Sequence, residues 1–364
     1  MKRVFIFGYY GFKNAGDDAM LESIINSIKK IRSDVDISVL TYNAKYTKTT
    51  HKVDVISRSK IFEIVSAIKN CDLLISGGGS LLQDITSSRS LIFYLGLIFM
   101  ARLFGKKVMF YGNGYGPVNK KFNRLLIKRL VSKVDLVTLR DDISREELNK
   151  LGITHNVEVT ADPTFTMKAC DSDRINEIFS IEKIPTDKEL VGISIRRWKN
   201  DGKTKETIAS AIDHISGLGA NVVLIPMKYP DDLDFSIEVK EVCKTKPHII
   251  ENYYKPEEIL GIISKMTMLV GIRLHSLIFA AIENVPMVAI EYDPKVKGFI
   301  KLVNQESVGD IGELDTINLC LSIDKVYYNR ENYKKVLSSK KPYFEEKALK
   351  TANMAVDLLY NELE

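Results

Sequence analysis

Short runs of β-branched and other apolar residues alternate with amphipathic helical stretches along most of the chain. The run 4–7 precedes a predicted helix over 17–30, and the run 73–76 follows a predicted helix over 61–69. This alternation is typical of β–α–β units, in which helices cover parallel strands. The sequence therefore predicts an α/β fold with parallel sheets.

The alternation is interrupted once and then starts again. A charged stretch without periodicity, 171–188, contains Pro185 and separates two series of strands and helices. The length of 364 residues also favours two domains over one. We therefore expect two doubly wound domains facing a cleft, over residues 1–170 and 186–340, with ligands bound at the carboxyl ends of the strands.

Composition limits the class of protein. Hydrophobic residues make up 45% and charged residues 27% of the chain, which is typical of a folded, soluble protein. The net charge of +5 is too small to argue for nucleic acid as a partner. The cysteines and histidines lack the spacing of a disulfide framework or a metal site, so we expect no metal and a cytoplasmic location. The longest apolar run, 91–101, is too short to span a bilayer.

Three glycine-rich loops follow strands of the first predicted domain, over residues 8–17, 77–80 and 112–117. Glycines allow backbone amides to approach a ligand, and the helix after the first loop offers N–H donors to an anion or a sugar hydroxyl. The alternative is a set of tight turns, although three successive glycines exceed what one turn needs. The spacings of a dinucleotide fingerprint and of a P-loop are absent. We expect these loops to form a binding rim.

Arginines follow strands in both predicted domains. Arg140 comes after the run 136–139, where a guanidinium can pair with phosphate or carboxylate at two points; a surface ion pair is the alternative. Arg196 and Arg197 close the first strand of the second domain beside the single tryptophan. One of these two arginines is expected to face solvent.

The sharpest cluster lies at a strand-to-helix junction, residues 271–276. Arg273 and His275 stand there at a helix N-terminus, whose positive end attracts an anion and helps to keep the histidine neutral. A capping or core histidine is the alternative. Lys295 opens the next predicted helix and is either a further positive charge for the same anion or a solvated lysine.

Residues 85–134 contain ten lysines and arginines and no acidic residue. The same stretch contains the apolar run 91–101. This combination suits a surface that meets anionic lipid headgroups or a lipid-linked diphosphate. The alternative is a buried helix beside a solvated basic one.

Taken together, these motifs resemble the polysaccharide pyruvyl transferase family, and within it the CsaB-type enzymes of Gram-positive cell-wall assembly. Their order and spacing extend over nearly the whole chain. The matching residues are Gly8–Asp17, Gly77–Ser80 with Gln83-Asp84, Gly112–Pro117, Arg140, Asp162-Pro163, Arg273–His275 and Tyr292–Lys295.

The resemblance implies a GT-B-like fold of two Rossmann-type domains, with the C-terminal helix 343–364 packing back on the first domain. It implies an enzyme without a cofactor, which transfers the enolpyruvyl group of phosphoenolpyruvate to a sugar as a 4,6-ketal and releases phosphate. In CsaB-type members the acceptor is a lipid-linked N-acetylmannosamine of a secondary cell-wall polysaccharide, and the product supports S-layer anchoring. Such an enzyme would work in the cytoplasm at the inner face of the membrane.

The family's chemistry assigns expected roles to the candidate residues. Phosphoenolpyruvate is a compact anion that needs several cations around it, and the expected ligands are Arg140, Arg196, Arg273, His275 and Lys295. The expected catalytic residues are Arg273, His275, which transfers a proton or hydrogen-bonds the leaving phosphate, and Asp17, which deprotonates the acceptor. The acceptor is expected on the rim of the first domain, at Tyr10, Gly11, Asn14, Gly78, Gly79, Ser80, Asn113 and Gly114.

Two other classes of protein share the predicted scaffold. A GT-B glycosyltransferase of cell-envelope polysaccharide synthesis would use a nucleotide sugar and usually needs a carboxylate for the ribose, for which Glu291 is the candidate. A sugar-binding or assembly factor would bind without turnover. The arginines and the histidine at strand ends argue against this second alternative.

Overall fold

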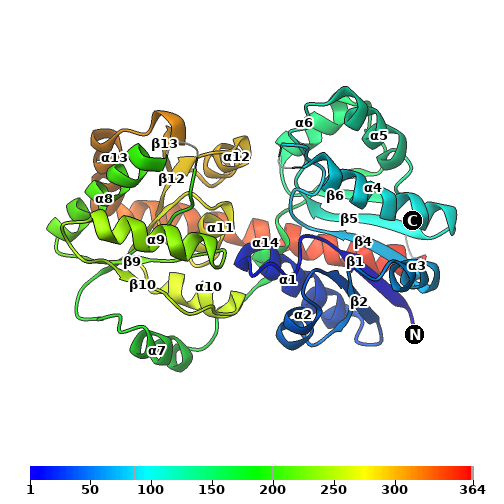
Figure 1. Cartoon of the computed structure of the whole chain (residues 1–364), viewed down its shortest axis with the longest axis horizontal. Helices are drawn as coiled ribbons and strands as arrows, with labels where there is room; N and C mark the ends of the chain where they lie inside the picture. Colours follow the sequence, from blue (N-terminus) through cyan, green and yellow to red (C-terminus); the bar gives the residue numbers. More distant parts are fainter. Residues whose placement is uncertain (86, 199–200, 362–364) are drawn as a thin grey trace. The chain divides into compact units, whose positions relative to one another are not determined.

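The computed structural model describes residues 1–85, 87–198 and 201–361, and the chain forms two compact units (Figure 1). The first unit comprises Met1–Phe12, Asp17–Thr166 and Tyr343–Glu364. The second comprises Lys13–Gly16 and Met167–Pro342. The expected first domain, 1–170, therefore differs from the first unit at two places, since four residues of its first loop and its last four residues belong to the second unit.

The first unit is built on a seven-stranded sheet with the order β3-β2-β1-β4-β5-β6-β7, and its strand pairs are parallel. The central strands β1 and β4 are buried apart from Arg3 at the start of β1, because helices cover both faces of the sheet. The strands are β1 Arg3–Phe7, β2 Asp36–Thr41, β3 Asp54–Ser57, β4 Leu73–Gly77, β5 Lys107–Asn113, β6 Leu136–Leu139 and β7 Val157–Val159.

Two separate apolar cores flank this sheet, because successive residues of a strand point to opposite faces. Phe5 packs in the core that contains Ile98, whereas Ile6 packs in the core that contains Ala352 near the C-terminus. The helices of this unit are α1 Ala15–Ile31, α2 Ala44–His51, α3 Ile61–Asn70, α4 Ser88–Leu103, α5 Lys121–Val131, α6 Asp142–Lys150, the 3-10 turn η1 Pro163–Thr166 and the part of α14 (Arg330–Tyr360) that follows Pro342.

The second unit contains a six-stranded parallel sheet with the order β10-β9-β8-β11-β12-β13. Its strands are β8 Leu190–Ser194, β9 Asn221–Leu224, β10 His248–Ile249, β11 Met268–Gly271, β12 Met287–Glu291 and β13 Glu306–Asp310. Its helices are α7 Ser172–Ile181, α8 Asp201–Gly217, α9 Asp231–Val242, α10 Pro256–Ser264, α11 Leu274–Ile282, α12 Pro294–Val303, the turn η2 Ile311–Glu313, α13 Thr316–Tyr328 and the start of α14. The predicted α/β class with two parallel sheets is confirmed.

Two helices differ from the expectation. The stretch 171–188 was expected to be non-periodic, but Asp171 accepts a hydrogen bond from the Arg174 backbone N–H at 2.8 Å and starts α7. Ile175, Ile178 and Phe179 then bury one side of that helix. The last helix includes Pro342 in its interior instead of starting after it. Among the residues that the structure describes, no helix has both the length and the apolar character needed to cross a bilayer.

Candidate functional site

The loops that carry the predicted cations of the second unit lie at one edge of its sheet. Arg196 follows β8, Arg273 follows β11, and Lys295 lies in the first turn of α12, directly after β12. These three strands are neighbours in the order β8-β11-β12, and parallel strands end at the same edge. In open α/β sheets this edge is the usual place for a ligand.

Arg273 is held by a buried carboxylate. Its Nε donates to Asp232 Oδ2 at 2.9 Å and its Nη2 donates to Oδ1 at 2.5 Å, so the pair is made at two points. Asp232, at the start of α9, also accepts the backbone N–H groups of Met227 at 3.2 Å and Lys228 at 2.9 Å. Asp232 was not predicted from the sequence, where its only signal is an acidic residue in the first turn of a helix after a strand.

Arg196 is a second cation close to Arg273. Its guanidinium carbon lies 4.7 Å from the centre of the Tyr292 ring and 5.5 Å from that of Trp198. Burial, followed by the positive charge of Arg273, lowers the pKa of Arg196. Its Nε is buried without a hydrogen-bond partner among the described residues. A desolvated cation with an open donor beside a second cation is a suitable partner for an anion.

Arg197, the next residue in the chain, has different surroundings. Arg197 is exposed and forms an ion pair with Glu238. Because the two arginines are adjacent in sequence and point to different surroundings, Arg197 offers a matched control for experiments on Arg196.

His275 lies in the first turn of α11 and packs tightly against Gly16. A Cβ added to Gly16 would overlap the imidazole ring. Gly16 is followed in the chain by Asp17, the expected base. The glycine at this position is therefore required by close approach of a ring.

Residues Lys13–Gly16 are fixed to the second unit by backbone hydrogen bonds. The Ala15 N–H donates to the Met227 carbonyl at 2.7 Å, and the Tyr229 N–H donates to the Lys13 carbonyl at 3.0 Å. Asn14 was expected on the acceptor rim of the first domain. It belongs to the second unit instead, since its backbone forms a bridge to Lys228.

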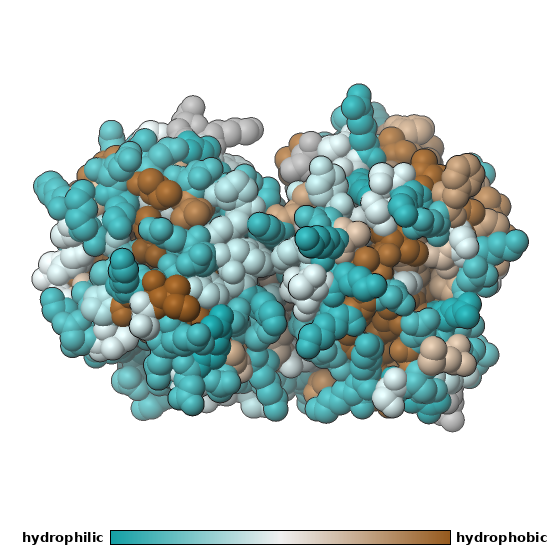
Figure 2. Space-filling view, turned by 60° about the horizontal axis from the view of Figure 1, so that its bottom comes forward, coloured by the Kyte–Doolittle hydropathy of each residue, from teal (hydrophilic) through white to brown (hydrophobic). Residues whose placement is uncertain are grey.

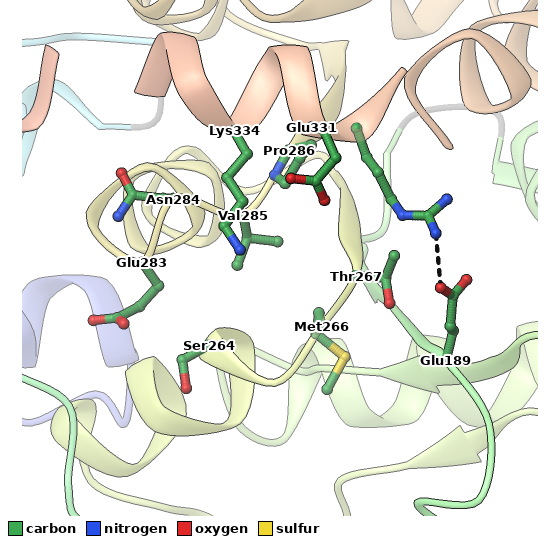
Figure 3. Close-up of a pocket in the computed structure, with 11 residues that line it drawn as sticks. Glu189, Ser264, Met266, Thr267, Glu283, Asn284, Val285, Pro286, Glu331 and Lys334 are labelled. Atoms are coloured by element: carbon green, nitrogen blue, oxygen red, sulfur yellow. Dashed lines mark hydrogen bonds and ion pairs between the residues drawn. The ribbon is translucent and has the colours of Figure 1, made fainter. Parts of the chain in front are cut away.

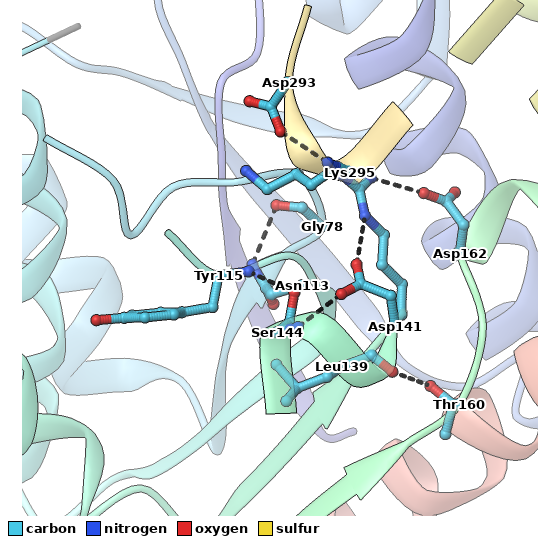
Figure 4. Close-up of polar contacts among 12 residues, drawn as sticks. Gly78, Asn113, Tyr115, Leu139, Asp141, Ser144, Thr160, Asp162, Asp293 and Lys295 are labelled. Atoms are coloured by element: carbon cyan, nitrogen blue, oxygen red, sulfur yellow. Dashed lines mark hydrogen bonds and ion pairs between the residues drawn. The ribbon is translucent and has the colours of Figure 1, made fainter. Parts of the chain in front are cut away.

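In the first unit, hydrogen bonds tie the loops after β4 and β5 together (Figure 4). Asn113 Nδ2 donates to the Gly78 carbonyl at 3.1 Å, and the Gly114 N–H donates to the Gly79 carbonyl at 2.9 Å. Asn113 is buried, and its Oδ1 has no hydrogen-bond partner among the described residues. The two loops thus lie together at this edge of the sheet, where the binding rim is predicted, and the buried Asn113 Oδ1 is an unsatisfied acceptor.

Arg140 lies beneath this rim and is buried. Its Nη1 donates to Asp162 Oδ2 at 2.8 Å, and its Nε lies 3.7 Å from Asp141 Oδ2. A Cβ on Gly114 would stand 2.8 Å from Ser80 Oγ and 3.2 Å from Arg140 Nε, so these two side chains fill the space around this glycine. The alternative of a surface ion pair is wrong for Arg140, because Arg140 and Asp162 are both buried.

Tyr10 does not reach the rim surface. Its ring is buried beneath Gly8 and Gly77, and its hydroxyl donates to the Gly77 carbonyl. Burial, with a smaller contribution from the charge of Asp17, raises the pKa of Tyr10 well above its usual value. The expected contact of Tyr10 with an acceptor is contradicted by this burial. Gly11 is buried as well, with φ +86° and Thr41 in the place of a Cβ, so packing and conformation account for this glycine.

Asp17 and three stacked rings complete the rim of the first unit. A Cβ on Gly79 would lie 3.5 Å from Asp17 Oδ1, which places the carboxylate beside the loop after β4. Tyr9 stacks on Phe12 with ring centres 4.0 Å apart, and Phe12 stacks on the exposed Tyr42 at 4.7 Å. This stack was not predicted from the sequence, where its signal is the aromatic pair at positions 9 and 12.

A pocket of about 300 Å³ lies at the opposite edge of the second sheet (Figure 3). Its lining includes Glu189, Thr267 and Pro286, which directly precede β8, β11 and β12. Arg330 of α14 donates to Glu189 at 2.9 Å. The pocket is thus separated from Arg196 and Arg273 by the length of the strands and is not part of the candidate site.

The two parallel sheets with their candidate residues at the carboxyl edges define a GT-B-like α/β protein. The chain is similar to MnaA of S. aureus in its structure with UDP, with a TM-score of 0.72 and 13% identity over 100% of this chain and 98% of that chain. It is also similar to UDP-GlcNAc 2-epimerase from Neisseria meningitidis bound to UDP-GlcNAc, with a TM-score of 0.68 and 14% identity over 99% of this chain and 100% of that chain. At these identities the likeness concerns the fold.

Sequence comparison identifies the family. The sequence pattern of the polysaccharide pyruvyl transferases matches residues 14–294, which is well over half of the chain. The chain therefore belongs to the polysaccharide pyruvyl transferase family, as the motifs indicated. It is also 23% identical to the amylovoran biosynthesis protein AmsJ of Erwinia amylovora, over 90% of this chain and 93% of that protein.

Proposed function

We propose that this protein transfers the enolpyruvyl group of phosphoenolpyruvate to two hydroxyls of a sugar, forming a ketal and releasing phosphate. Membership of the family supports the class of enzyme. The observation that carries the choice of donor is the pair Arg196 and Arg273 at the carboxyl edge of the second sheet, where one cation is desolvated and has an open Nε.

The second unit offers a compact anion several positive groups. Asp232 fixes the orientation of Arg273, while Arg196 presents its open donor beside an aromatic wall. The N-termini of α11 and α12 follow strands that end at the same edge and add their partial positive charge. His275 lies in the first turn of α11 and Lys295 in the first turn of α12. We assign the phosphate and carboxylate of phosphoenolpyruvate to this group.

The proposed reaction balances without a cofactor. One sugar hydroxyl attacks C2 of phosphoenolpyruvate while C3 gains a proton and becomes a methyl group. The phosphate then leaves with the electron pair of the C2–O bond, and the second hydroxyl adds to C2. Of the two hydroxyl protons, one ends on C3 and the other on phosphate. His275 would deliver a proton to C3 or to the phosphate, and Asp17 would accept one from the acceptor.

The first unit would hold the acceptor. Sugar rings present apolar faces that pack on exposed aromatic rings, and the stack of Tyr9, Phe12 and Tyr42 offers such a surface. The open Oδ1 of Asn113 suits a sugar hydroxyl. As the finer proposal we retain a lipid-linked N-acetylmannosamine, a 4,6-ketal and a role in S-layer anchoring, all from the CsaB-type resemblance. Arg140 stays a predicted ligand of phosphoenolpyruvate.

The experiment incubates the purified full chain with phosphoenolpyruvate and a diphosphate-linked GlcNAc–ManNAc acceptor, and follows phosphate release and product mass together. The proposal predicts equal amounts of phosphate and of a product heavier by one pyruvyl group. Arg196→Met and His275→Ala should lose this activity, whereas Arg197→Met should keep it. Full activity of a folded His275→Ala protein would remove His275 from the mechanism.

The alternative function is that of a nucleotide-sugar-dependent glycosyltransferase. Its candidate carboxylate, Glu291, stands at the end of β12, where its Oε1 accepts a hydrogen bond from the Ser307 hydroxyl at 2.7 Å. Release of a nucleotide from a sugar nucleotide, with no phosphate from phosphoenolpyruvate, would favour this alternative.

A further inference from the structure

Helix α4 exposes large apolar side chains on the side that faces away from the sheet. Its inner side is buried, with Leu95 and Ile98 in the apolar core. On the outer side, Ile92, Phe99 and Leu103 are 47%, 50% and 67% exposed. The spacing of these three positions places them in one stripe along the helix. The alternative expectation for this stretch, a buried helix beside a solvated basic one, therefore holds for the inner side of α4 but not for its outer side.

Helix α5 contacts α4 and also exposes large apolar side chains. Phe122 and Leu125 are 64% and 62% exposed and lie one turn apart. On the face drawn in Figure 2, apolar residues form brown patches among hydrophilic ones on both units. We call the set Ile92, Phe99, Leu103, Phe122 and Leu125 the α4–α5 face.

Basic side chains border this face. Exposed lysines and arginines of the two helices and their ends are Arg89, Arg102, Lys120, Lys121, Arg124, Lys128 and Arg129. Since residues 85–134 contain no acidic residue, neither helix balances these charges itself. Arg102 forms an ion pair at 3.1 Å with Asp135, the first acidic residue after residues 85–134. The face thus combines apolar side chains with a surplus of positive charge.

We propose that the α4–α5 face docks on the surface of an anionic lipid bilayer. Exposed apolar side chains insert at the boundary of headgroups and acyl chains, and basic side chains around them pair with anionic headgroups. A symmetric contact with a second copy of the chain would place this basic surface against itself, which costs free energy. Large exposed apolar patches are uncommon on soluble monomers. The inference does not depend on the proposed transfer reaction.

The test measures sedimentation of the full chain with two kinds of vesicle, one of phosphatidylcholine alone and one in which a third of the lipid is phosphatidylglycerol. The wild type should bind only the anionic vesicles, and added salt should weaken binding. Because each basic residue near the surface contributes a factor of about five, Lys121→Gln/Lys128→Gln/Arg129→Gln should weaken binding about a hundredfold. The matched control, Lys244→Gln/Lys246→Gln/Lys265→Gln, removes the same charge from exposed positions of the second unit and should weaken it far less.

A second pair of variants tests the apolar component. Phe99→Ser/Leu103→Ser removes two exposed side chains one turn apart on α4, and should abolish most binding to the anionic vesicles. Ile317→Ser/Leu321→Ser makes the same kind of change on α13 of the second unit, where both residues are also exposed, and should keep it. Thermal unfolding of all four variants shows that they are folded.

Three results would overturn the proposal. These are equal binding to both kinds of vesicle, no binding to either, and equal losses in the matched variants. A dimer in solution that Phe99→Ser/Leu103→Ser converts to a monomer would assign the face to a second copy of the chain instead.

Discussion

The imidazole of His275 occupies the space that a side chain at Gly16 would need. Gly16→Ala is therefore expected to displace the ring while leaving every charged group of the site in place. A shift of about 1 Å in a catalytic group lowers turnover about a hundredfold, so we predict a loss of this size in kcat with a small change in KM. Steady-state kinetics measure it.

The control for this prediction is Gly217→Ala, a helical glycine of the second unit where an added Cβ would have no atom within 4 Å beyond its neighbours in the helix backbone. It should keep full activity. Unchanged kcat in Gly16→Ala would show that the contact has no role in positioning His275.

We predict that Arg196 lowers the free energy of unfolding of the free protein and strengthens the binding of phosphoenolpyruvate. Its guanidinium is desolvated and lies near the positive charge of Arg273, so Arg196→Met should leave the free protein equally stable or more stable by about 1 kcal/mol. The same change should weaken phosphoenolpyruvate binding about a hundredfold, since it removes a hydrogen-bonding charge. Thermal unfolding with and without phosphoenolpyruvate measures both effects. A loss of stability with unchanged binding would contradict the assignment.

Gly114→Ala should disturb the rim of the first unit. The added Cβ would lie 2.8 Å from Ser80 Oγ, so we predict a loss of about 1–3 kcal/mol in the free energy of unfolding and weaker acceptor binding. Removal of the colliding atom in Ser80→Ala/Gly114→Ala should restore most of the stability. Urea unfolding measures the difference, and equal losses in the single and double variants would show that Ser80 is not the cause.

The titration of His51 is expected to make the free energy of unfolding depend on pH. Its Nδ1 lies 2.5 Å from Glu22 Oε2 and its Nε2 lies 3.8 Å from Asp18 Oδ1. Burial alone would lower the pKa of His51, but the two carboxylates outweigh it and raise the pKa to about 9. The protonated ring thus contributes its full stability below the unfolded pKa of about 6.5, and loses it as pH rises through about 9.

Urea unfolding at several pH values between 6 and 10 measures this effect. The free energy of unfolding should fall over that window in the wild type and in His155→Gln, which changes an exposed histidine. In His51→Gln the fall should be smaller. Equal slopes in all three proteins would exclude His51 as the titrating group.

Sequence patterns predicted the class of fold because buried parallel strands and their covering helices have different periods. They also placed Arg196 and Arg273 correctly after strand ends and Lys295 at the start of the helix after β12, since the position of a residue after a strand fixes its edge of the sheet. Contacts between distant positions were not predictable. Asp232 meets Arg273 only because α9 and β11 fold together, and this pairing leaves no local signal.

The first glycine loop shows a second limit. Residues 9 and 10 were indistinguishable tyrosines in the sequence, yet Tyr10 is buried under the loops while Tyr9 stacks on Phe12. Beyond the end of a strand, alternation no longer decides which side chain faces inward. Residues Lys13–Gly16 belong to the second unit because of backbone hydrogen bonds, and side-chain patterns do not encode such bonds.

The transfer of the enolpyruvyl group can be followed through the carbon atoms of the donor. Phosphoenolpyruvate labelled with carbon-13 at C2 and C3 is incubated with the full chain and the acceptor, and the products are examined by NMR. We expect the label in the saccharide as a methyl carbon bonded to a ketal carbon, together with an equal amount of phosphate. Label that remains in phosphoenolpyruvate, or that is released as free pyruvate while the saccharide stays unlabelled, would contradict it.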